Sequence, residues 1–242
     1  MAGQQTLQWP SRIALVDDRT ENDLYFAVKR CIDVILAGLL LILLLPLISL
    51  IAILVKLDSA GPIFFTQERV GARRQWLGRQ AIWIVRNFAM YKFRSMVQNA
   101  DSSVHAMYIR DFVKGRARPS SKSNGKFKLT NDARVTRIGR LLRKSSLDEL
   151  PQLFNVLKGD MSLVGPRPVP PYEVACYGNG HHKRLAALPG ITGYWQVKGR
   201  GQVSFEEMIR MDLEYIQNAS MWRDLKILFL TIPAVLSRRG AE

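Results

Sequence analysis

Residues 34–55 read VILAGLLLILLLPLISLIAILV, an uncharged run that decides what kind of protein this is. As one straight helix the run would be about 33 Å long, enough to cross the hydrocarbon core of a bilayer. A soluble helix that is apolar on every side would be unusual in a chain of 242 residues. The run also starts too late and is too long for a secretory signal peptide. The sequence therefore predicts insertion into a membrane.

Pro46 lies near the middle of this run and bears on how the helix sits in the bilayer. Proline removes one backbone hydrogen bond and kinks a helix. Lys29 and Arg30 precede the run and Lys56 follows it, so the positive-inside rule gives no direction for a crossing. A re-entrant hairpin that enters and leaves by one face would satisfy both sets of cations. The alternative is a proline-kinked single span, and the residues alone favour the hairpin only slightly.

The chain carries 35 basic and 20 acidic residues, a net charge of +15, and nearly all of the excess follows the apolar run. Such a charge indicates polyanionic partners, namely nucleic acid, anionic lipid or phosphorylated substrates. With 48% apolar residues the chain is too hydrophobic to be disordered, and two cysteines exclude a disulfide scaffold. The sequence contains no Walker loop and no dinucleotide-binding glycine fingerprint, so nucleotide folds of those types lack support.

These patterns divide the chain into three parts: an N-terminal lead at 1–28, a membrane helix at 29–57 and a basic domain at 58–242, with a basic insert at 101–128. The expected fold class is mixed α/β and mainly helical. Its parts are a re-entrant membrane hairpin broken at Pro46, a small β-hairpin and amphipathic helices that lie in the membrane interface.

The periodicity of the basic domain predicts its elements in more detail. Alternating apolar and polar residues predict two short strands at 63–70 and 87–94. Helical spacing predicts helices at 101–114, at 132–144 with Asp132 as the cap, and onward to about 158. Ser204 and Glu207 form a capping box for the next helix. The last helix, at 220–238, is too short to cross a bilayer but suits the interface.

Asp148 and Glu149 lie in the cluster richest in chemically informative residues. Ser146 and Glu149 have the spacing of a capping box, so the acidic pair judged alone favours a structural role. Adjacent helical side chains diverge by about 100°, however, so one carboxylate could face a phosphorus centre while the other holds a metal ion. Arg143 and Arg167 could then grip phosphate oxygens. This constellation would suit phosphoryl transfer with an aspartyl nucleophile and Mg²⁺.

At this point the chain resembles a known family, the bacterial sugar transferases, also called monotopic phosphoglycosyl transferases. The resemblance runs from about Lys29 to the last helix. It rests on motifs that follow one another in order: Lys29-Arg30-x-x-Asp33, the apolar run with Pro46, Gly61-Pro62, Gln67-x-Arg69-x-Gly71, YKFRSM at 91–96, RKSSLDELPQ at 143–152, NVLKGDMS at 155–162, GPRP at 165–168, PGITG at 189–193, Gly199-Arg200 and Asp212-x-x-Tyr215.

The resemblance implies a specific activity. Enzymes of this family embed through a proline-broken, re-entrant helix on the cytoplasmic face of the bacterial inner membrane. They transfer a sugar-1-phosphate from a UDP-sugar to undecaprenyl phosphate and release UMP. By this match Asp148 would be the nucleophile that forms a phosphosugar-aspartyl intermediate, and Glu149 would bind Mg²⁺.

Further roles follow from the same match. Arg143, Arg167 and Arg200 would grip phosphate groups, and Asp212 would belong to the same substrate site with a less defined role. The last group would stabilise the membrane hairpin: Lys29, Arg30, Asp33 and Pro46.

The implied partners are a UDP-sugar, undecaprenyl phosphate and membrane lipid, without nucleic acid, and a homodimer is left open. The implied pathway is exopolysaccharide, lipopolysaccharide O-antigen or other glycoconjugate synthesis, and no short motif indicates which hexose is carried. Trp195 stands where the family usually has alanine, which bears on local packing.

Two rival functions remain at this stage. One is a membrane-tethered basic protein that binds polyanions without catalysis, although the basic residues are interleaved with packing positions rather than gathered into a binding motif. The other is a conventional single-span enzyme with a different donor, such as a CDP-alcohol.

Overall fold

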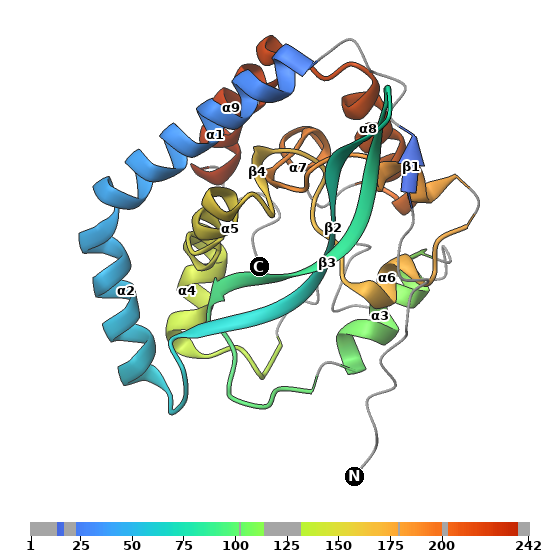
Figure 1. Ribbon diagram of the computed structural model, residues 1–242. Helices are drawn as coiled ribbons and strands as arrows, with labels where there is room; N and C mark the ends of the chain where they lie inside the picture. Colours follow the sequence, from blue (N-terminus) through green and yellow to red (C-terminus); the bar gives the residue numbers. More distant parts are fainter. Residues whose placement is uncertain are drawn as a thin grey trace.

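The computed structural model describes residues 14–16, 23–101, 103–113, 132–178, 180–199 and 203–236. Within these ranges the fold is mixed α/β with helix predominating, as the sequence predicts (Figure 1). In chain order the elements are β1 (Ala14–Val16), α1 (Asp23–Leu43), α2 (Leu45–Asp58), β2 (Phe64–Leu77), β3 (Gln80–Phe93), α3 (Ser103–Val113), α4 (Arg137–Ser145), the 3₁₀ helix η1 (Leu147–Glu149), α5 (Gln152–Lys158), β4 (Ser162–Val164), α6 (Pro171–Val174), the 3₁₀ helix η2 (His181–Leu185), β5 (Gly190–Thr192), α7 (Tyr194–Lys198), α8 (Phe205–Gln217) and α9 (Met221–Leu236).

The apolar run forms two helices, α1 and α2, that meet at a bend of 63°. Pro46 lies in the first turn of α2, where its missing N–H costs little, so the predicted break at this proline is confirmed. Neither helix is by itself both long and apolar enough for a membrane span. The bent pair taken together meets those criteria by length and composition.

Large apolar side chains cover the outer surface of this helix pair. They lie at and around the bend and carry no packing partner that would hide them from solvent: Val34, Ile35, Leu39, Leu40, Ile42, Leu43, Leu45, Leu50, Ile53 and Leu57 are all exposed. The inner surface is different, because Ala37, Ile51 and Val55 are buried against the rest of the domain. One face of the pair therefore packs on the protein, and the other face is a large exposed apolar surface.

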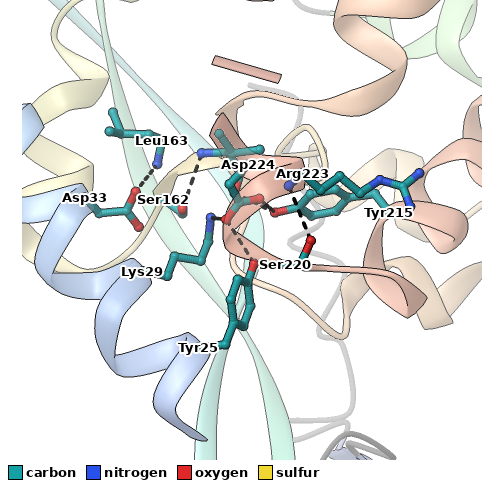
Figure 2. Close-up of polar contacts among 10 residues, drawn as sticks. Tyr25, Lys29, Asp33, Ser162, Leu163, Tyr215, Ser220, Arg223 and Asp224 are labelled. Atoms are coloured by element: carbon teal, nitrogen blue, oxygen red, sulfur yellow. Dashed lines mark hydrogen bonds and ion pairs between the residues drawn. The ribbon is translucent and has the colours of Figure 1, made fainter. Parts of the chain in front are cut away.

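Three polar side chains in the first half of α1 bind the rest of the domain, and Figure 2 shows two of them, Lys29 and Asp33. The Lys29 ammonium lies 2.6 Å from a carboxylate oxygen of Asp224 on α9, and both side chains are buried. Arg30 donates to the carbonyls of Val156 and Leu157 at the end of α5. Asp33 accepts a hydrogen bond from the backbone N–H of Leu163 on β4, at 3.0 Å. The charged residues before the apolar run thus fasten α1 to α5, β4 and α9.

The far end of α2 returns to the same domain. Arg94 is buried, and its guanidinium donates to the carbonyls of Val55, Ser59 and Ala60, where α2 ends. Those carbonyls would otherwise have no partner within the helix. Ile51 and Val55 pack in one cluster with Phe93 and Leu142. Both ends of the α1–α2 pair are therefore attached to one body.

The long strands β2 and β3 form an antiparallel hairpin that runs through the middle of the molecule (Figure 1). Their pairing continues from Phe64 opposite Phe93 to Leu77 opposite Gln80, and Gly78 takes a positive φ of 63° in the turn. The sequence predicts much shorter strands at 63–70 and 87–94. That prediction was wrong in length, because the pairing continues through residues 71–77 and 80–86 to the turn.

The predicted helix ends were partly right. Ser204 caps α8 by accepting from the N–H of Glu207 at 3.3 Å, so this cap is confirmed. The cap of α4 is Thr136, which accepts from Gly139 at 3.0 Å, and the prediction of Asp132 was wrong. Asp132 instead forms an ion pair with Arg134, two residues along the chain.

Two predicted regions lie mostly outside the described residues. Of the basic insert, only residue 101 and α3 are described, and of the N-terminal lead, β1 and the first turns of α1. Strand β1 pairs with β3, so the described sheet has the order β1-β3-β2.

The buried ion pair of Lys29 generates a stability prediction. Lys29→Met leaves the Asp224 carboxylate buried without its cation, and we expect it to lower the free energy of unfolding by about 3 kcal/mol. Asp23→Asn is the matched control, since it breaks an ion pair with Arg74 in which the Asp23 side chain is 55% exposed. That change should cost less than about 1 kcal/mol. Denaturant unfolding in detergent micelles measures both, and equal losses would contradict the prediction.

Candidate active site

Asp148 and Glu149 sit on η1, a single turn wedged between α4 and α5. Helix α4 ends at Ser146, which takes the left-handed conformation with φ 59°, so the chain changes direction sharply there. The backbone N–H of Ser146 bonds back to the carbonyl of Arg143. This turn places the two acids at the start of the next helical segment. Asp148 is only 8% exposed.

The capping-box interpretation of Ser146 and Glu149 was wrong. The Ser146 side chain makes no capping hydrogen bond, because its left-handed backbone is not the extended one that an N-cap requires. Glu149 reaches instead across to β3, where one of its carboxylate oxygens lies 2.8 Å from the ammonium of Lys92. Both side chains of this pair are about four-fifths buried.

Sequence reasoning assigned no role to Lys92, although it lies in the quoted segment at 91–96. A signal was available, since lysine is a frequent phosphate-binding residue. Its partner, however, is 57 positions away in the chain. Only the packing of α5 on β3 brings the two together.

Asn155 fixes that packing. Its side-chain amide donates to the carbonyl of Ala89 at 2.7 Å and accepts from the N–H of Tyr91 at 3.0 Å, so it bonds to β3 as a neighbouring strand would. Asn155 is fully buried, and both bonds are needed to satisfy its amide. Helix α5, which directly follows the turn of the acidic pair, is thus held in one register against the strand that carries Lys92.

The loop that carries Arg167 also borders the site, and its position depends on Gly165 and Gly190. A Cβ atom on Gly165 would lie 2.3 Å from the carbonyl of Leu188, and one on Gly190 would lie 2.1 Å from the N–H nitrogen of Gly165. The motifs at 165–168 and 189–193 therefore pack backbone against backbone. Strands β4 and β5 pair in parallel beside them. Arg167 projects from this joint and is half-buried.

Two hollows meet at Arg167. The first, of about 200 Å³, is lined by Lys92, Glu149 and Gln152 on one side and by Arg167 and Gln196 on the other. Gln152 is almost fully buried at the first position of α5. We call this the carboxylate hollow.

The second hollow is lined by Arg69, His105, Glu173 and Arg184 together with Arg167. We call it the arginine hollow. Its residues come from β2, α3, α6 and η2, and sequence reasoning assigned none of them a role. Arg69 at least stood in a quoted motif, whereas nothing in the sequence singles out His105.

Positive charge dominates the arginine hollow. Burial and the neighbouring Arg167 cation together lower the pKa of Arg69 to about 10. Burial likewise lowers the pKa of His105 from 6.5 to about 4, with additional effects of Arg69, Arg167, Arg134 and Arg143. His105 is therefore neutral at physiological pH. Its Nδ1 lies 2.6 Å from the hydroxyl of Tyr172.

Arg143 is placed near this group. It lies in the last turn of α4 and is half-buried, and its cation is close enough to act on the pKa of His105. The structure thus brings Asp148, Glu149, Arg143 and Arg167 into one region. Arg200 lies outside the described residues.

Asp212 reaches the site through its ion pair with Arg184. It is fully buried on α8, and its carboxylate lies 2.5 Å from the guanidinium of Arg184. Arg184 also pairs with Glu173 at 3.3 Å. Burial raises the pKa of Asp212 to about 6. A buried carboxylate repels phosphate, so this geometry makes Asp212 a positioning residue for Arg184, which lines the arginine hollow.

Trp195, which stands where the family usually has alanine, is buried. It is 4% exposed and lies in one cluster with Phe112, Phe205, Met208 and Ile209. The large ring thus joins α3, α7 and α8 behind the arginine hollow.

The described residues of the site could hold a magnesium ion only together with a bound substrate. Among the described residues no three His, Cys, Asp or Glu side chains gather in a metal-binding group. Glu149 could supply one carboxylate oxygen while the other stays with Lys92. Mg²⁺ is commonly held by one or two carboxylates together with substrate phosphates, so an ion bound jointly with substrate fits these residues and a preformed protein cage does not.

Fold and site together define a class: a basic α/β protein with a bent apolar helix pair on its surface and a site suited to phosphorylated substrates. The model of the family described as "Bacterial sugar transferase" matches residues 24–238. The chain belongs to that family.

Similar proteins cover the same region. The chain is 41% identical over 213 residues to the exopolysaccharide production protein ExoY of Sinorhizobium fredii, covering 88% of this chain and 87% of that one. It is 41% identical over 214 residues to the undecaprenyl-phosphate galactose phosphotransferase of Salmonella typhimurium, covering 88% of this chain and 41% of that one. It is 40% identical over 235 residues to the UDP-glucose:undecaprenyl-phosphate glucose-1-phosphate transferase of Xanthomonas campestris, covering 91% and 41%. The chain thus spans about two-fifths of the last two.

The lowered pKa of His105 generates a prediction on stability. Because the folded state binds fewer protons than the unfolded state between the pKa values of about 4 and 6.5, the free energy of unfolding falls as the pH drops through this range. Between about pH 7.5 and about pH 5 the His105 contribution to this fall is about 2 kcal/mol. His105→Phe should remove it. Denaturant unfolding at both pH values measures the difference, and equal falls in the two proteins would refute the assignment.

Proposed function

We propose that this protein transfers a sugar-1-phosphate from a UDP-sugar to undecaprenyl phosphate with release of UMP. The observation that carries the proposal is the acidic pair of Asp148 and Glu149: Asp148 is buried, and Glu149 pairs with Lys92 and lines the carboxylate hollow together with Arg167. Family membership and the printed names of relatives, which specify undecaprenyl phosphate as acceptor, support it. The name of ExoY supports a place in exopolysaccharide production. A polyanion-binding protein without catalysis has no use for a buried acidic pair in a cationic site.

The reaction proceeds in two displacements. A carboxylate oxygen of Asp148 attacks the β-phosphorus of the donor, and the bond from that phosphorus to the bridging oxygen breaks, so UMP departs with the oxygen and its electron pair. A phosphate oxygen of the lipid acceptor then attacks the same phosphorus. The bond to Asp148 breaks, the carboxylate is restored and the lipid carries a diphosphate-linked sugar. Each displacement is easier than one direct transfer between two anions.

The other residues of the site bind the negatively charged phosphates or the metal ion. Arg143 and Arg167 neutralise phosphate oxygens, since guanidinium groups make forked contacts with them. Lys92 holds Glu149 in place, and Glu149 would bind Mg²⁺ together with the donor phosphates. The bound ion would stabilise negative charge that develops on the departing phosphate. Arg200 is proposed as a further phosphate ligand from the family match alone.

The α1–α2 pair is proposed to enter and leave the membrane by one face. Lys29, Arg30 and Asp33 fasten its first end to the domain and Arg94 fastens its second. A straight span would carry those two ends to opposite sides of the bilayer, which their shared attachment opposes. Residues 29–57 would thus be a re-entrant element, and 58–242 a catalytic domain on the cytoplasmic face.

Helix α9 supports this placement of the domain at a membrane surface. Trp222 is 78% exposed and Phe229 is 70% exposed, and Leu225 and Ile232 are exposed as well. An aromatic and aliphatic face of this kind suits the boundary between lipid headgroups and acyl chains. The basic surplus of the chain adds attraction to anionic lipid. A homodimer remains a proposal drawn from the resemblance.

Asp148→Asn tests the covalent step. With a UDP-sugar labelled on the sugar, and with Mg²⁺, the wild type should acquire label before the acceptor is added, and chelation of Mg²⁺ should prevent this. The Asp148→Asn variant should stay unlabelled and release UMP at least about 10³-fold more slowly. A panel of UDP-sugars in the same assay identifies the hexose.

The control is Asp160→Asn, which removes a carboxylate that pairs with Arg86 outside both hollows. This variant should be labelled like the wild type. Full turnover by Asp148→Asn would exclude Asp148 as the nucleophile, and release of CMP from a CDP-alcohol donor would exclude the proposed reaction.

Cysteine labelling tests the re-entrant topology. In a variant without Cys31 and Cys176, one new cysteine replaces Gln5 in the N-terminal lead and another, in a separate protein, replaces the exposed Arg79 at the hairpin turn. A membrane-impermeant maleimide should label both sites in inverted vesicles and neither in intact spheroplasts. Labelling of the two sites from opposite sides would establish a single span.

A further inference from the structure

Arg69 is a buried cation whose charge the described protein does not neutralise. It is 7% exposed, and its guanidinium donates only to uncharged acceptors, the carbonyl of Pro168 at 3.2 Å and the side-chain oxygen of Gln67 at 2.6 Å. Among the described residues no carboxylate lies within ion-pair distance of Arg69, and its Nε–H is buried without a hydrogen-bond partner. A buried, unpaired charge is costly, so such a group indicates an anionic ligand.

The acids nearest to Arg69 are already engaged. Glu173 lines the same hollow, but it accepts from Arg184 at 3.3 Å and from the Tyr177 hydroxyl at 2.9 Å. Glu149 pairs with Lys92 in the carboxylate hollow. The arginine hollow is therefore lined by Arg69 and Arg167 together with the neutral ring of His105. Its chemistry suits a phosphate.

The two hollows are neighbours, because Arg167 and Pro168 line both of them. Glu149 lines the carboxylate hollow and follows Asp148 in the chain, so under the proposed function the β-phosphorus is attacked beside that hollow. The other phosphate of the donor lies one bridging oxygen away from the β-phosphorus. The arginine hollow, which shares Arg167, is close enough to receive it.

Position relative to the membrane element distinguishes between the two phosphates that could bind here. The carboxylate hollow is bounded by α5, which packs directly on α1. The arginine hollow is bounded by β2, α3 and α6, and in Figure 1 α3 and α6 lie across the β2–β3 ribbon from α1 and α2. A lipid-linked phosphate arrives from the side of the helix pair. The arginine hollow thus faces the water-soluble substrate.

We propose that the arginine hollow is the subsite for the nucleotide-side phosphate of the donor, with Arg69 as its principal ligand. The inference rests on the proposed function for the identity of the donor. When the β-phosphorus is attacked, negative charge grows on the bridging oxygen and on the phosphate that departs with it. A guanidinium already desolvated beside that phosphate stabilises the charge more strongly than one in water.

Arg69→Gln removes the cation and keeps a polar group, and Arg69→Lys restores the charge without the forked donors. Arg73→Gln is the matched control, because Arg73 is an exposed arginine on the same strand. Equilibrium dialysis of UMP against the full chain in detergent micelles measures the subsite without any turnover. We expect the Kd for UMP to rise about tenfold or more in Arg69→Gln, to rise less in Arg69→Lys and to stay unchanged in Arg73→Gln.

Steady-state kinetics supply the second readout. The KM for the UDP-sugar and the inhibition constant of UMP should rise together in Arg69→Gln, while the KM for undecaprenyl phosphate stays the same. A rise in the acceptor KM instead would assign the hollow to the lipid phosphate, and a rise in both would show a purely structural role; either result overturns the inference.

Failure of the two proposals can be told apart. Absence of UMP release by the wild type would defeat the proposed reaction, whereas the dialysis result decides the subsite by itself. Failure of the wild type to bind UMP, or equal binding by the wild type and Arg69→Gln, overturns the subsite even if the transferase reaction is confirmed.

Discussion

The placement of the α1–α2 pair depends on one buried ion pair. The Lys29 ammonium and the Asp224 carboxylate lie 2.6 Å apart inside the protein, and the hydroxyls of Tyr25 and Tyr215 also donate to Asp224 (Figure 2). Separating the two side chains would leave a buried charge without a partner, which is strongly destabilising. Helix α1 must therefore stay docked on α9 as it leaves the domain. Arg94 donates hydrogen bonds to the end of α2, so both ends of the α1–α2 pair are attached to one domain and the apolar bend projects from it.

The same body holds the reactive groups through short-range backbone contacts. Asn155 joins α5, the helix that follows the acidic pair, to β3, and Gly165 and Gly190 allow the loop of Arg167 to lie against its neighbour. Neither joint leaves room for adjustment, since a buried amide needs both of its bonds and an added Cβ would collide. The acids and the arginines are thus held on facing walls. Helix α5 belongs to both assemblies, because it carries Asn155 and receives Arg30 from the membrane element.

Local chemistry explains which parts of the molecule the sequence predicts well. The apolar run, the break at Pro46 and the cap at Ser204 depend on neighbours within one or two turns. Asp148, Glu149 and Arg143 are adjacent in sequence, so their association needs no knowledge of the fold. The wrong prediction of a capping box also came from a local pattern. Ser146 has the spacing of a capping residue, but its left-handed backbone turns the chain away, and Glu149 finds its partner on a distant strand.

The sequence by itself determined that this is a basic chain with a proline-broken apolar helix and a cluster of acidic and basic residues, because composition and spacing carry that information directly. Only the tertiary structure decided that Lys92 faces Glu149 and that Arg69 and His105 share a hollow with Arg167. It also decided that Asp212 serves Arg184. Those pairs lie on different elements, and their meeting depends on strand register and helix packing, which are set by burial of the whole core rather than by any short segment.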